Sequence, residues 1–383
     1  MNILLLCYEK INGNNGAVRQ ILENAEKLQK IGHRVAICVP RIARLPNPPV
    51  PIYYIPVINI PNIRYPSYII FSIIFLIPIF FKFKPHRVLY YIIHYNIAAF
   101  LTLQLFRCPY AVYVNGIIHE ERAYKSLLEK WSSPILQRIY KITLHSANII
   151  FTVTGGLKKH LISSHLVDHK NILILKDGVD TDVFTPRDKK QLRKKLCLNE
   201  KGSIIGFHGW LFPWHGVDYL IEAAPYIINE LPDTVFLIVG YGIMYHALQD
   251  MVQKKNVQKH VVFTGSVPFN KIAEYVSCFD LGINFFKPVR TDPGDPIKMY
   301  EYMACEVPII ASDVEGYGDF LEKAGAGVRI NPEDPQNLAQ KIIELLKNPD
   351  ARKKMGAAGR KEVQNNHTWM QRALQIEQSF KNM

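Results

Sequence analysis

Cysteine is scarce in this sequence, and its positions fit neither of the motifs that cysteines usually form. Six cysteines occur in 383 residues, with no Cys-x-x-Cys pair and no Cys/His set at zinc-ligand spacing. They are Cys7, Cys38, Cys108, Cys197, Cys278 and Cys305. A structural zinc site or the disulfide framework of a small secreted domain needs such spacings. We therefore predict a protein of a reducing compartment, without a metal site.

A secretory leader and a bilayer-spanning run are also absent from the pattern. The opening MNILLLCYEK is apolar, but it has no basic start and no small-residue cleavage site, so we expect a buried first strand. The longest apolar run, Tyr68 to Phe81, has fourteen residues and contains Pro78. A helix needs about 20 residues to cross a bilayer, so this run is too short to span one.

The same run favours a membrane contact of another kind. It is followed by three cations, Lys82, Lys84 and Arg87. We expect residues 68–87 to lie on an anionic membrane surface, with apolar side chains in the interface and cations at the headgroups. The protein would then be cytoplasmic and peripheral on the inner face of the cell membrane. The alternative is a buried helix hairpin of the first domain.

Acidic residues are the scarcer charge. Lys and Arg number 46 against 33 Asp and Glu, a net charge of +13, which favours anionic partners. The densest cationic run, RDKKQLRKKL from Arg187 to Leu196, has leucines at helical spacing and is interpreted as a solvated helix face rather than a polyanion site. The other cations are dispersed and no nucleic-acid-binding motif occurs, so no nucleic-acid partner is expected.

Short apolar runs alternate with amphipathic stretches along the whole chain. The runs are ILLLC, RVAICV, VLYYII, YAVYV, NIIFTV and NILILK, and after Asp180 the pattern restarts with SIIGFHG, VFLIVG, VVFTG, DLGINFF, PIIAS and GVRI. Such alternation indicates parallel sheets that helices bury on both faces. A single core stops growing at roughly 250–300 residues. We therefore predict an α/β fold with two doubly wound, Rossmann-like units.

The boundary between the two units is predicted in a turn-rich connector, KDGVDTDVFTP, from Lys176 to Pro186. This gives domains 1–177 and 178–365, and leaves an amphipathic helix at 366–383 that caps either of them. Ligands of open parallel sheets bind beyond the carboxyl ends of the strands. Two such sheets facing each other would form a cleft.

Glycines follow several of the predicted strands. Asn12 to Gly16 precedes a helix, where backbone amides and the helix dipole favour an anion, although a tight strand-to-helix turn explains these residues equally well. After Gly209 comes a loop with Trp210, Trp214 and His215, which contacts a ligand or simply packs. Further glycines end the next two strands, at Gly240 and Gly265, where turn chemistry is the alternative explanation.

The stretch from Thr291 to Asp313 places a proline-rich acidic loop before a predicted helix that runs from about Pro296 to Ala304. The free amides of Ile297 and Lys298 would point at a ligand, and Lys298 at a helix start favours an anion there. Glu301, one turn later, would accept two hydrogen bonds from a ribose. A surface Lys/Glu pair is the alternative.

Together these stretches resemble family 4 glycosyltransferases of the GT-B fold, and the resemblance spans nearly the whole chain. The motifs that carry it are, in order, the N-terminal glycine loop, KDGVDTDVFTP, WHGVDYLIEAA, IVGYG, FTG and PIKMYEYMACEVPIIASD. The resemblance implies transfer of a hexose, with retention, from a nucleotide-diphosphate-sugar donor. It also implies that basic groups and helix N-termini hold the diphosphate and that no metal or other cofactor is needed.

Site residues follow from the resemblance position by position. Glu301 would contact the ribose hydroxyls, and Asn115 falls where many members have a histidine that touches the donor sugar, with His119 as a substitute. The residues expected to carry catalysis are Asn115, His119, His215, Lys298 and Glu301. Those expected to bind the donor are Gly16, Gly209, Trp210, Gly240, Gly265, Val267, Asp292, Asp295 and Ile297. His94, which ends the run VLYYII, faces the cleft or is a structural histidine.

The sequence departs from the family pattern at three positions. Trp210 stands where the family has an arginine, His215 where it has a lysine, and Pro293 where it has the first of two glutamates. His215 and Lys298 would then replace the diphosphate clamp. We predict a glycosyltransferase acting on a lipid-linked or cell-envelope glycan. The alternatives are nucleotide-sugar epimerisation or a catalytically weakened nucleotide-sugar-binding protein.

Overall fold

The structure is a computed structural model with two compact units. It describes residues 1–11, 16–61, 63–92, 96–117, 133–164, 166–167, 171–287, 294–314 and 316–383, with the backbone alone at 133–136. Unit 1 comprises Met1–Asp177 and Trp369–Met383, and unit 2 comprises Gly178–Thr368. The chain therefore leaves unit 1 after Asp177 and returns to it at Trp369.

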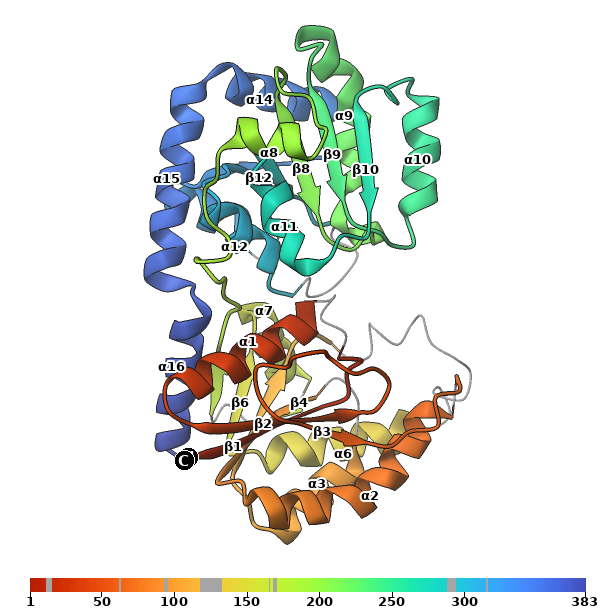
Figure 1. The fold of residues 1–383 in the computed structure, drawn as a ribbon, viewed down its shortest axis with the longest axis vertical. Helices are drawn as coiled ribbons and strands as arrows, with labels where there is room; N and C mark the ends of the chain where they lie inside the picture. The colour runs from red at the N-terminus through yellow and green to blue at the C-terminus, as the bar shows by residue number, and fades with distance from the viewer. Residues whose placement is uncertain are drawn as a thin grey trace. The chain divides into compact units, whose positions relative to one another are not determined.

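Unit 1 is built on a seven-stranded parallel sheet in the order β3-β2-β1-β4-β5-β6-β7. Its strands are β1 (Asn2–Cys7), β2 (Arg34–Pro40), β3 (Ile52–Ile55), β4 (Arg87–Tyr91), β5 (Tyr110–Val114), β6 (Ile149–Thr152) and β7 (Ile172–Ile174). Its helices are α1 (Gly16–Lys30), α2 (Arg64–Phe83), α3 (Ile97–Leu105), α6 (Ser133–His145), α7 (Gly155–Ser163) and α16 (Trp369–Lys381). Figure 1 shows α1 and α16 on one face of the sheet, and α2, α3 and α6 on the other. The sheet is thus covered on both sides.

Helix α2 contains the long apolar run and corrects two expectations. It is one continuous helix of 20 residues, so the hairpin alternative is wrong and the run is part of a longer element than its fourteen residues indicated. One stripe of α2, spaced every four residues, is buried in unit 1 and consists of Tyr68, Ser72, Leu76 and Phe80. Ser67 and Phe83 are also buried, and the other residues of the helix are half-buried or exposed. The helix therefore has a buried apolar face and an exposed face that is also apolar, unlike an amphipathic helix, whose exposed face is polar.

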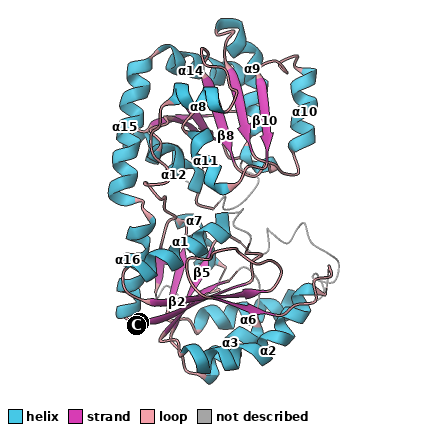
Figure 2. Ribbon diagram, in the orientation of Figure 1, coloured by secondary structure: helices cyan, strands magenta, loops and turns pink. Residues whose placement is uncertain are grey.

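Unit 2 repeats the plan with a six-stranded parallel sheet in the order β10-β9-β8-β11-β12-β13. Its strands are β8 (Ile204–His208), β9 (Val235–Val239), β10 (Val261–Gly265), β11 (Leu281–Asn284), β12 (Ile309–Ser312) and β13 (Gly327–Ile330). Its helices are α8 (Lys189–Lys195), the 3-10 turn η1 (Pro213–His215), α9 (Val217–Glu230), α10 (Tyr245–Lys254), α11 (Phe269–Val276), α12 (Ile297–Ala304), α13 (Tyr317–Lys323), α14 (Pro335–Lys347) and α15 (Pro349–Asn366). Figure 2 shows the alternation of helices and strands in each unit. The prediction of two doubly wound α/β units is confirmed.

Successive residues of the strands in unit 2 enter two different cores. In β8, Ile205 packs with α9 and α14, whereas Ile204 packs in the core that contains α11 and α12. In β9, Phe236 and Leu237 divide in the same way. Because side chains alternate along a strand, the sheet must be buried on both faces, as the continuous apolar runs predicted.

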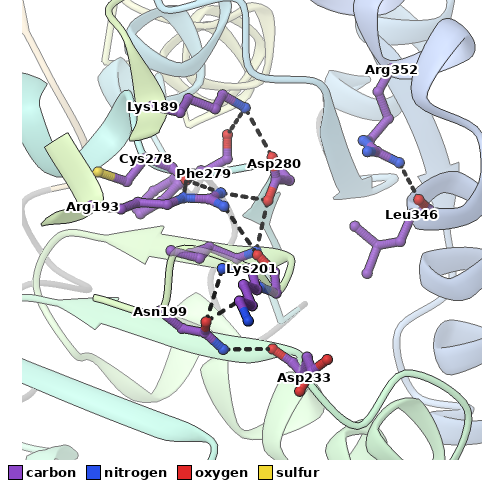
Figure 3. A network of polar contacts seen from close by, with 12 residues as sticks. Lys189, Arg193, Asn199, Lys201, Asp233, Cys278, Phe279, Asp280, Leu346 and Arg352 are labelled. Atoms are coloured by element: carbon purple, nitrogen blue, oxygen red, sulfur yellow. Dashed lines mark hydrogen bonds and ion pairs between the residues drawn. The ribbon is translucent and has the colours of Figure 1, made fainter. Parts of the chain in front are cut away.

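Two residues of the cationic run before β8, Lys189 and Arg193, are anchored, whereas Lys190, Lys194 and Lys195 are exposed as expected. Arg193 is 7% exposed and donates to the carbonyl oxygen of Cys278 at 2.7 Å and to Asp280 at 2.6 Å, and Lys189 pairs with the same carboxylate at 3.1 Å (Figure 3). Burial alone would raise the pKa of Asp280, but the two cations hold it below its usual range. The expectation of a solvated helix face is therefore wrong for these residues, which tie α8 to the amino end of β11.

Candidate functional site

The strand order of unit 2 places a topological switch point between β8 and β11. From β8 the chain builds outward through β9 to β10, and then crosses to β11 on the other side. In sheets of this kind, ligands bind beyond the carboxyl ends of the strands at such a point. The residues that follow β8, β9 and β11 are therefore the first candidates for a site.

Three glycines, Gly209, Gly240 and Gly265, lie at the carboxyl ends of β8, β9 and β10. Gly209 and Gly240 have φ angles of +136° and +142°, which favour glycine, and a Cβ on Gly240 would collide with the carbonyl oxygen of Gly209. The amide of Gly209 donates to Val239 at 2.9 Å, and Gly240 bridges to Gly265. Space is open at Gly265, where a Cβ would meet no atom within 4 Å. These strand ends let a ligand approach the backbone closely, and Val267 packs half-buried just beyond them.

Lys298 is a buried cation above these strand ends. Its side chain comes from α12 and is 9% exposed, and a Cβ on Gly209 would lie 3.5 Å from its Cε atom. Its Nζ atom is buried and makes no hydrogen bond or ion pair within the described residues, which leave out Asp292. The nitrogen lies 4.6 Å from the ring centroid of Phe207 and 5.4 Å from that of Phe286. Two aromatic faces compensate only part of the cost of burying a charge.

Burial also changes the proton affinity of this lysine. Desolvation lowers the pKa of Lys298 from 10.5 to about 7. An anion bound beside Nζ would favour the charged form and raise the pKa again. The group is therefore suited to receive a negative charge at the switch point.

Glu301 lies one turn further along α12 and is more deeply buried than predicted. Its side chain is 1% exposed, and its carboxylate lies 2.6 Å from Nε2 of His208, the last residue of β8. The next residue, Tyr302, accepts a hydrogen bond from the backbone amide of His208 at 2.9 Å. The alternative of a surface Lys/Glu pair is wrong, because both Lys298 and Glu301 are buried at the end of β8.

The loop after Gly209 is held in one conformation. Nδ1 of His215 is hydrogen-bonded to the carbonyl oxygen of Trp210, and because that oxygen can only accept, Nδ1 carries a proton. The ring of His215 lies 5.6 Å from Phe286, so His215 and Lys298 contact the same aromatic side chain. For His215 to donate to an anion through Nε2, the ring must be doubly protonated.

The loop before α12 differs in one respect from the prediction. The amide of Ile297 donates to the carbonyl oxygen of Asp295 at 3.1 Å, so it does not point freely at a ligand. The carboxylate of Asp295 accepts from the hydroxyl of Tyr300 at 3.0 Å, and Tyr317 donates to the carbonyl oxygen of Gly294. These contacts fix the loop to α12 and to α13. Asp292 lies outside the described residues.

Of the predicted residues that belong to unit 1, the structure describes Gly16 and Asn115. Gly16 begins α1 and is exposed. Asn115 follows β5 and donates to Gln20 of α1 at 2.8 Å, and Gln20 in turn donates to Asp177. The Oδ1 atom of Asn115 is buried and accepts no hydrogen bond within the described part of the chain. His119 and His94 lie outside it.

Sequence reasoning missed His208, Phe207 and Phe286, which surround Lys298 and Glu301. A signal for His208 was present: it stands four residues after Ile204 in the same strand, so it shares the sheet face that α12 covers. No comparable signal marks the aromatic pair. Among the described residues, no group of three or more His, Cys, Asp or Glu side chains is arranged to hold a metal ion.

Comparison with known proteins gives matches along nearly the whole chain. The family model "Glycosyltransferase Family 4" matches residues 14–183, and "Glycosyl transferases group 1" matches residues 188–362. Both models describe glycosyltransferases.

Curated relatives match over part of the chain. A Corynebacterium glutamicum protein named GDP-mannose-dependent monoacylated alpha-(1-6)-phosphatidylinositol monomannoside mannosyltransferase is 33% identical over 52% of this chain and 54% of its own length. A GDP-mannose-dependent alpha-(1-6)-phosphatidylinositol monomannoside mannosyltransferase of Mycolicibacterium smegmatis is 30% identical over 53% and 54%. The chain thus spans about half the length of these relatives.

Solved structures match over nearly the full length. Sucrose-phosphate synthase from Thermosynechococcus elongatus has a TM-score of 0.79 at 17% identity, with 99% of this chain and 98% of that chain covered. Anabaena HepE in complex with UDP has a TM-score of 0.78 at 16% identity, with both chains fully covered. At these identities the likeness concerns the fold.

Proposed function

This chain belongs to the group 1, family 4 glycosyltransferases of the GT-B fold, and we propose that it transfers a hexose from a nucleotide-diphosphate-sugar donor to a lipid-linked or cell-envelope glycan. The observation that carries the proposal is the buried ammonium group of Lys298 at the switch point of unit 2. A nucleotide diphosphate supplies the negative charge that this group needs. The named donor of the first relatives, GDP-mannose, is the first donor to test.

The proposed mechanism rests on stabilising the leaving diphosphate. Negative charge develops on its bridging oxygen as the bond to the anomeric carbon breaks, and a fixed cation beside that oxygen lowers the barrier. Lys298 supplies the cation, with His215 beside it when its ring is doubly protonated. Glu301, oriented by His208, accepts from the ribose hydroxyls. We further propose that the configuration at the anomeric carbon is retained, that an oxygen of the leaving phosphate accepts the proton of the acceptor hydroxyl, and that no metal takes part.

A panel of nucleotide sugars tests the donor. We expect GDP-mannose, or one other nucleotide hexose, to raise the melting temperature, because a ligand at 100 times its Kd stabilises the fold by about 2.7 kcal/mol. Incubation with that donor, with and without glycolipid, then separates the activities. An epimerase changes the donor without acceptor, and a binding protein leaves it unchanged in both mixtures. Lack of stabilisation by any nucleotide sugar would contradict the proposed function.

We also propose that unit 1 presents an apolar surface to the membrane that contains the acceptor. The α2–α3 surface is formed by side chains on two helices that pack against each other, and each of these side chains is 50% to 67% exposed. They are Ile70, Ile73, Ile74, Phe81, Leu101 and Leu105. Exposed apolar groups gathered in this way mark an interaction site.

The charge around the α2–α3 surface favours an anionic bilayer as the partner. From residue 27 to residue 119 the sequence contains ten lysines and arginines and not one Asp or Glu. Lys82, Lys84 and Arg107 are exposed at the ends of the two helices. Among the described helices, α2 is the one long and apolar enough to cross a membrane by length and composition. Its buried stripe holds it against the sheet of unit 1, so we propose that it lies in the interface.

The double variant Phe81→Ser, Leu105→Ser is expected to bind vesicles containing an anionic lipid at least about tenfold more weakly than the unmodified protein, because each residue loses part of a burial worth about 1.5–3 kcal/mol. Co-sedimentation with phosphatidylglycerol vesicles measures this, and binding should also weaken as salt is raised. Leu374→Ser, at an exposed leucine of α16, is the matched control. If the double variant bound as well as this control, the surface would not be the anchor.

A further inference from the structure

The stacked aromatic residues of the loop after β8 are not explained by the diphosphate site. The rings of Phe212 and Trp214 lie 4.4 Å apart at an interplanar angle of 10°, and Trp210 stacks on Phe212 at 6.0 Å and 24°. We call Trp210, Phe212 and Trp214 the aromatic ladder. Its outer member, Trp210, is 47% exposed, whereas Phe212 and Trp214 are half-buried. Packing within the loop therefore leaves one large ring facing solvent.

The ladder is held rigid by its neighbours. The amide of Leu211 donates to Tyr241 at 3.1 Å, and Leu211 accepts from the amide of Met244 at 3.0 Å. On the other side, His215 binds the carbonyl oxygen of Trp210, and the carbonyl oxygen of Trp214 accepts from the amide of Lys287 at 2.9 Å. These contacts fix the backbone of the loop before any ligand arrives, and stacking on Phe212 orients the ring of Trp210. A preformed surface loses little entropy when it binds.

The ladder also adjoins the buried lysine. Trp210 follows Gly209, where a Cβ would lie 3.5 Å from the Cε atom of Lys298, and Phe286 contacts both Lys298 and His215. Trp210 is therefore next in sequence to a residue that borders Lys298, and a ligand whose anionic group reaches Lys298 can extend toward the aromatic ladder. In a nucleotide-diphosphate sugar the diphosphate is flanked by the ribose, which the proposed function assigns to Glu301, and by the pyranose ring.

We propose that Trp210 is a stacking platform for a pyranose ring, and that it determines sugar binding in the site of the proposed function, on which this inference rests. One face of a pyranose presents C–H groups with a small positive charge, which are attracted to the negative face of an indole ring. Phe212 and Trp214 support that ring from behind. The sugar belongs either to the donor or to the acceptor glycan, and the chemistry of the contact is the same for both.

Paired titrations with GDP and GDP-mannose test the platform. We expect Trp210→Ala and Trp210→Leu to bind GDP-mannose about fivefold to tenfold more weakly than the unmodified protein and to bind GDP equally well. Trp210→Phe, which keeps an aromatic face, should recover most of the loss. Tyr226→Ala, which removes an aromatic residue of α9 that is 45% exposed, is the matched control. Calorimetry gives the affinities, and circular dichroism verifies the fold of each variant.

The outcomes separate the two sources of the sugar and the two hypotheses. If GDP-mannose affinity is kept but the KM for phosphatidylinositol monomannoside rises in Trp210→Ala and recovers in Trp210→Phe, the platform holds the acceptor sugar. Equal weakening of GDP and GDP-mannose, or no change in either affinity or in the acceptor KM, overturns the platform while the proposed function stands. Failure of the unmodified protein to bind any nucleotide sugar instead overturns the proposed function.

Discussion

Lys298→Met is expected to lower kcat/KM for the donor by about 100- to 1,000-fold, the range seen when a preorganised donor to a developing oxyanion is removed. Methionine keeps the length of the side chain and its contacts with Phe207 and Phe286, but it has no charge. Initial rates of donor hydrolysis and of transfer measure the loss. Lys255→Met is the matched control, because Lys255 pairs with Glu222 on the surface of the same unit.

The same substitution should stabilise the protein, with a defined pH dependence. Burial lowers the pKa of Lys298 from 10.5 to about 7, so between these values the unfolded chain holds a proton that the folded chain does not. The stability of the unmodified protein therefore rises with pH between about 7 and 10.5. Below about pH 7 the lysine is charged in both states, so the free-energy cost of burying its charge is fully present. Lys298→Met should raise the melting temperature most at pH 6 to 7 and progressively less toward pH 10.

Donor affinity should change in the opposite direction. A bound diphosphate favours the charged lysine, so the affinity of the unmodified protein is expected to fall as pH rises above about 7. Lys298→Met should lack this dependence. Unchanged donor hydrolysis in the variant, with the same pH profile as the unmodified protein, would remove Lys298 from the diphosphate site.

Glu301→Ala is expected to lower kcat/KM by at least about 100-fold and to destabilise the fold by about 1–3 kcal/mol, since it removes the buried polar contact between Glu301 and His208. Glu301→Gln keeps the shape and removes the charge, so it should retain more stability while losing donor affinity. Chemical unfolding and steady-state kinetics measure the two effects. Glu274→Gln is the matched control, because Glu274 is a buried carboxylate that pairs with Lys195 and Lys271.

A variant of His208 separates binding from positioning. If Glu301 contacts the ribose, His208→Asn should raise the KM for the donor less than Glu301→Gln does. A Glu301→Gln enzyme with unchanged KM and kcat would show that the carboxylate serves the fold alone.

The fold could be predicted from the sequence because its dominant signal is local. Each buried parallel strand is a short apolar run, and these runs predicted the strands of both sheets except β3. The segment IYYI of β3 lies between Pro51 and Pro56 at the edge of the sheet, where its side chains are mostly half-buried. A strand of only four residues at the edge of a sheet is shorter and less buried than a central strand, so it is harder to recognise as a separate apolar run.

The candidate site was less predictable because it depends on side-chain direction. The glycines at the ends of β8, β9 and β10 can be recognised in the sequence because each follows an apolar run. Lys298 and Glu301 can be recognised because they belong to a motif. That both are buried, and that His208 pairs with Glu301, follows from how α12 packs on the sheet. The amide of Ile297 was predicted to donate to a ligand, but it donates to the carbonyl oxygen of Asp295 in a local turn.

The position of α16 in the chain affects how the protein is made. Its residues Ala373, Ile376 and Phe380 are completely buried in the core of unit 1, although they follow all of unit 2 in the sequence. During translation, every strand of unit 2 leaves the ribosome before these residues do, so unit 2 has its core residues available first. The nascent unit 1 must therefore expose the surface that α16 covers until α16 itself has been synthesised, and chaperones have that interval in which to bind it.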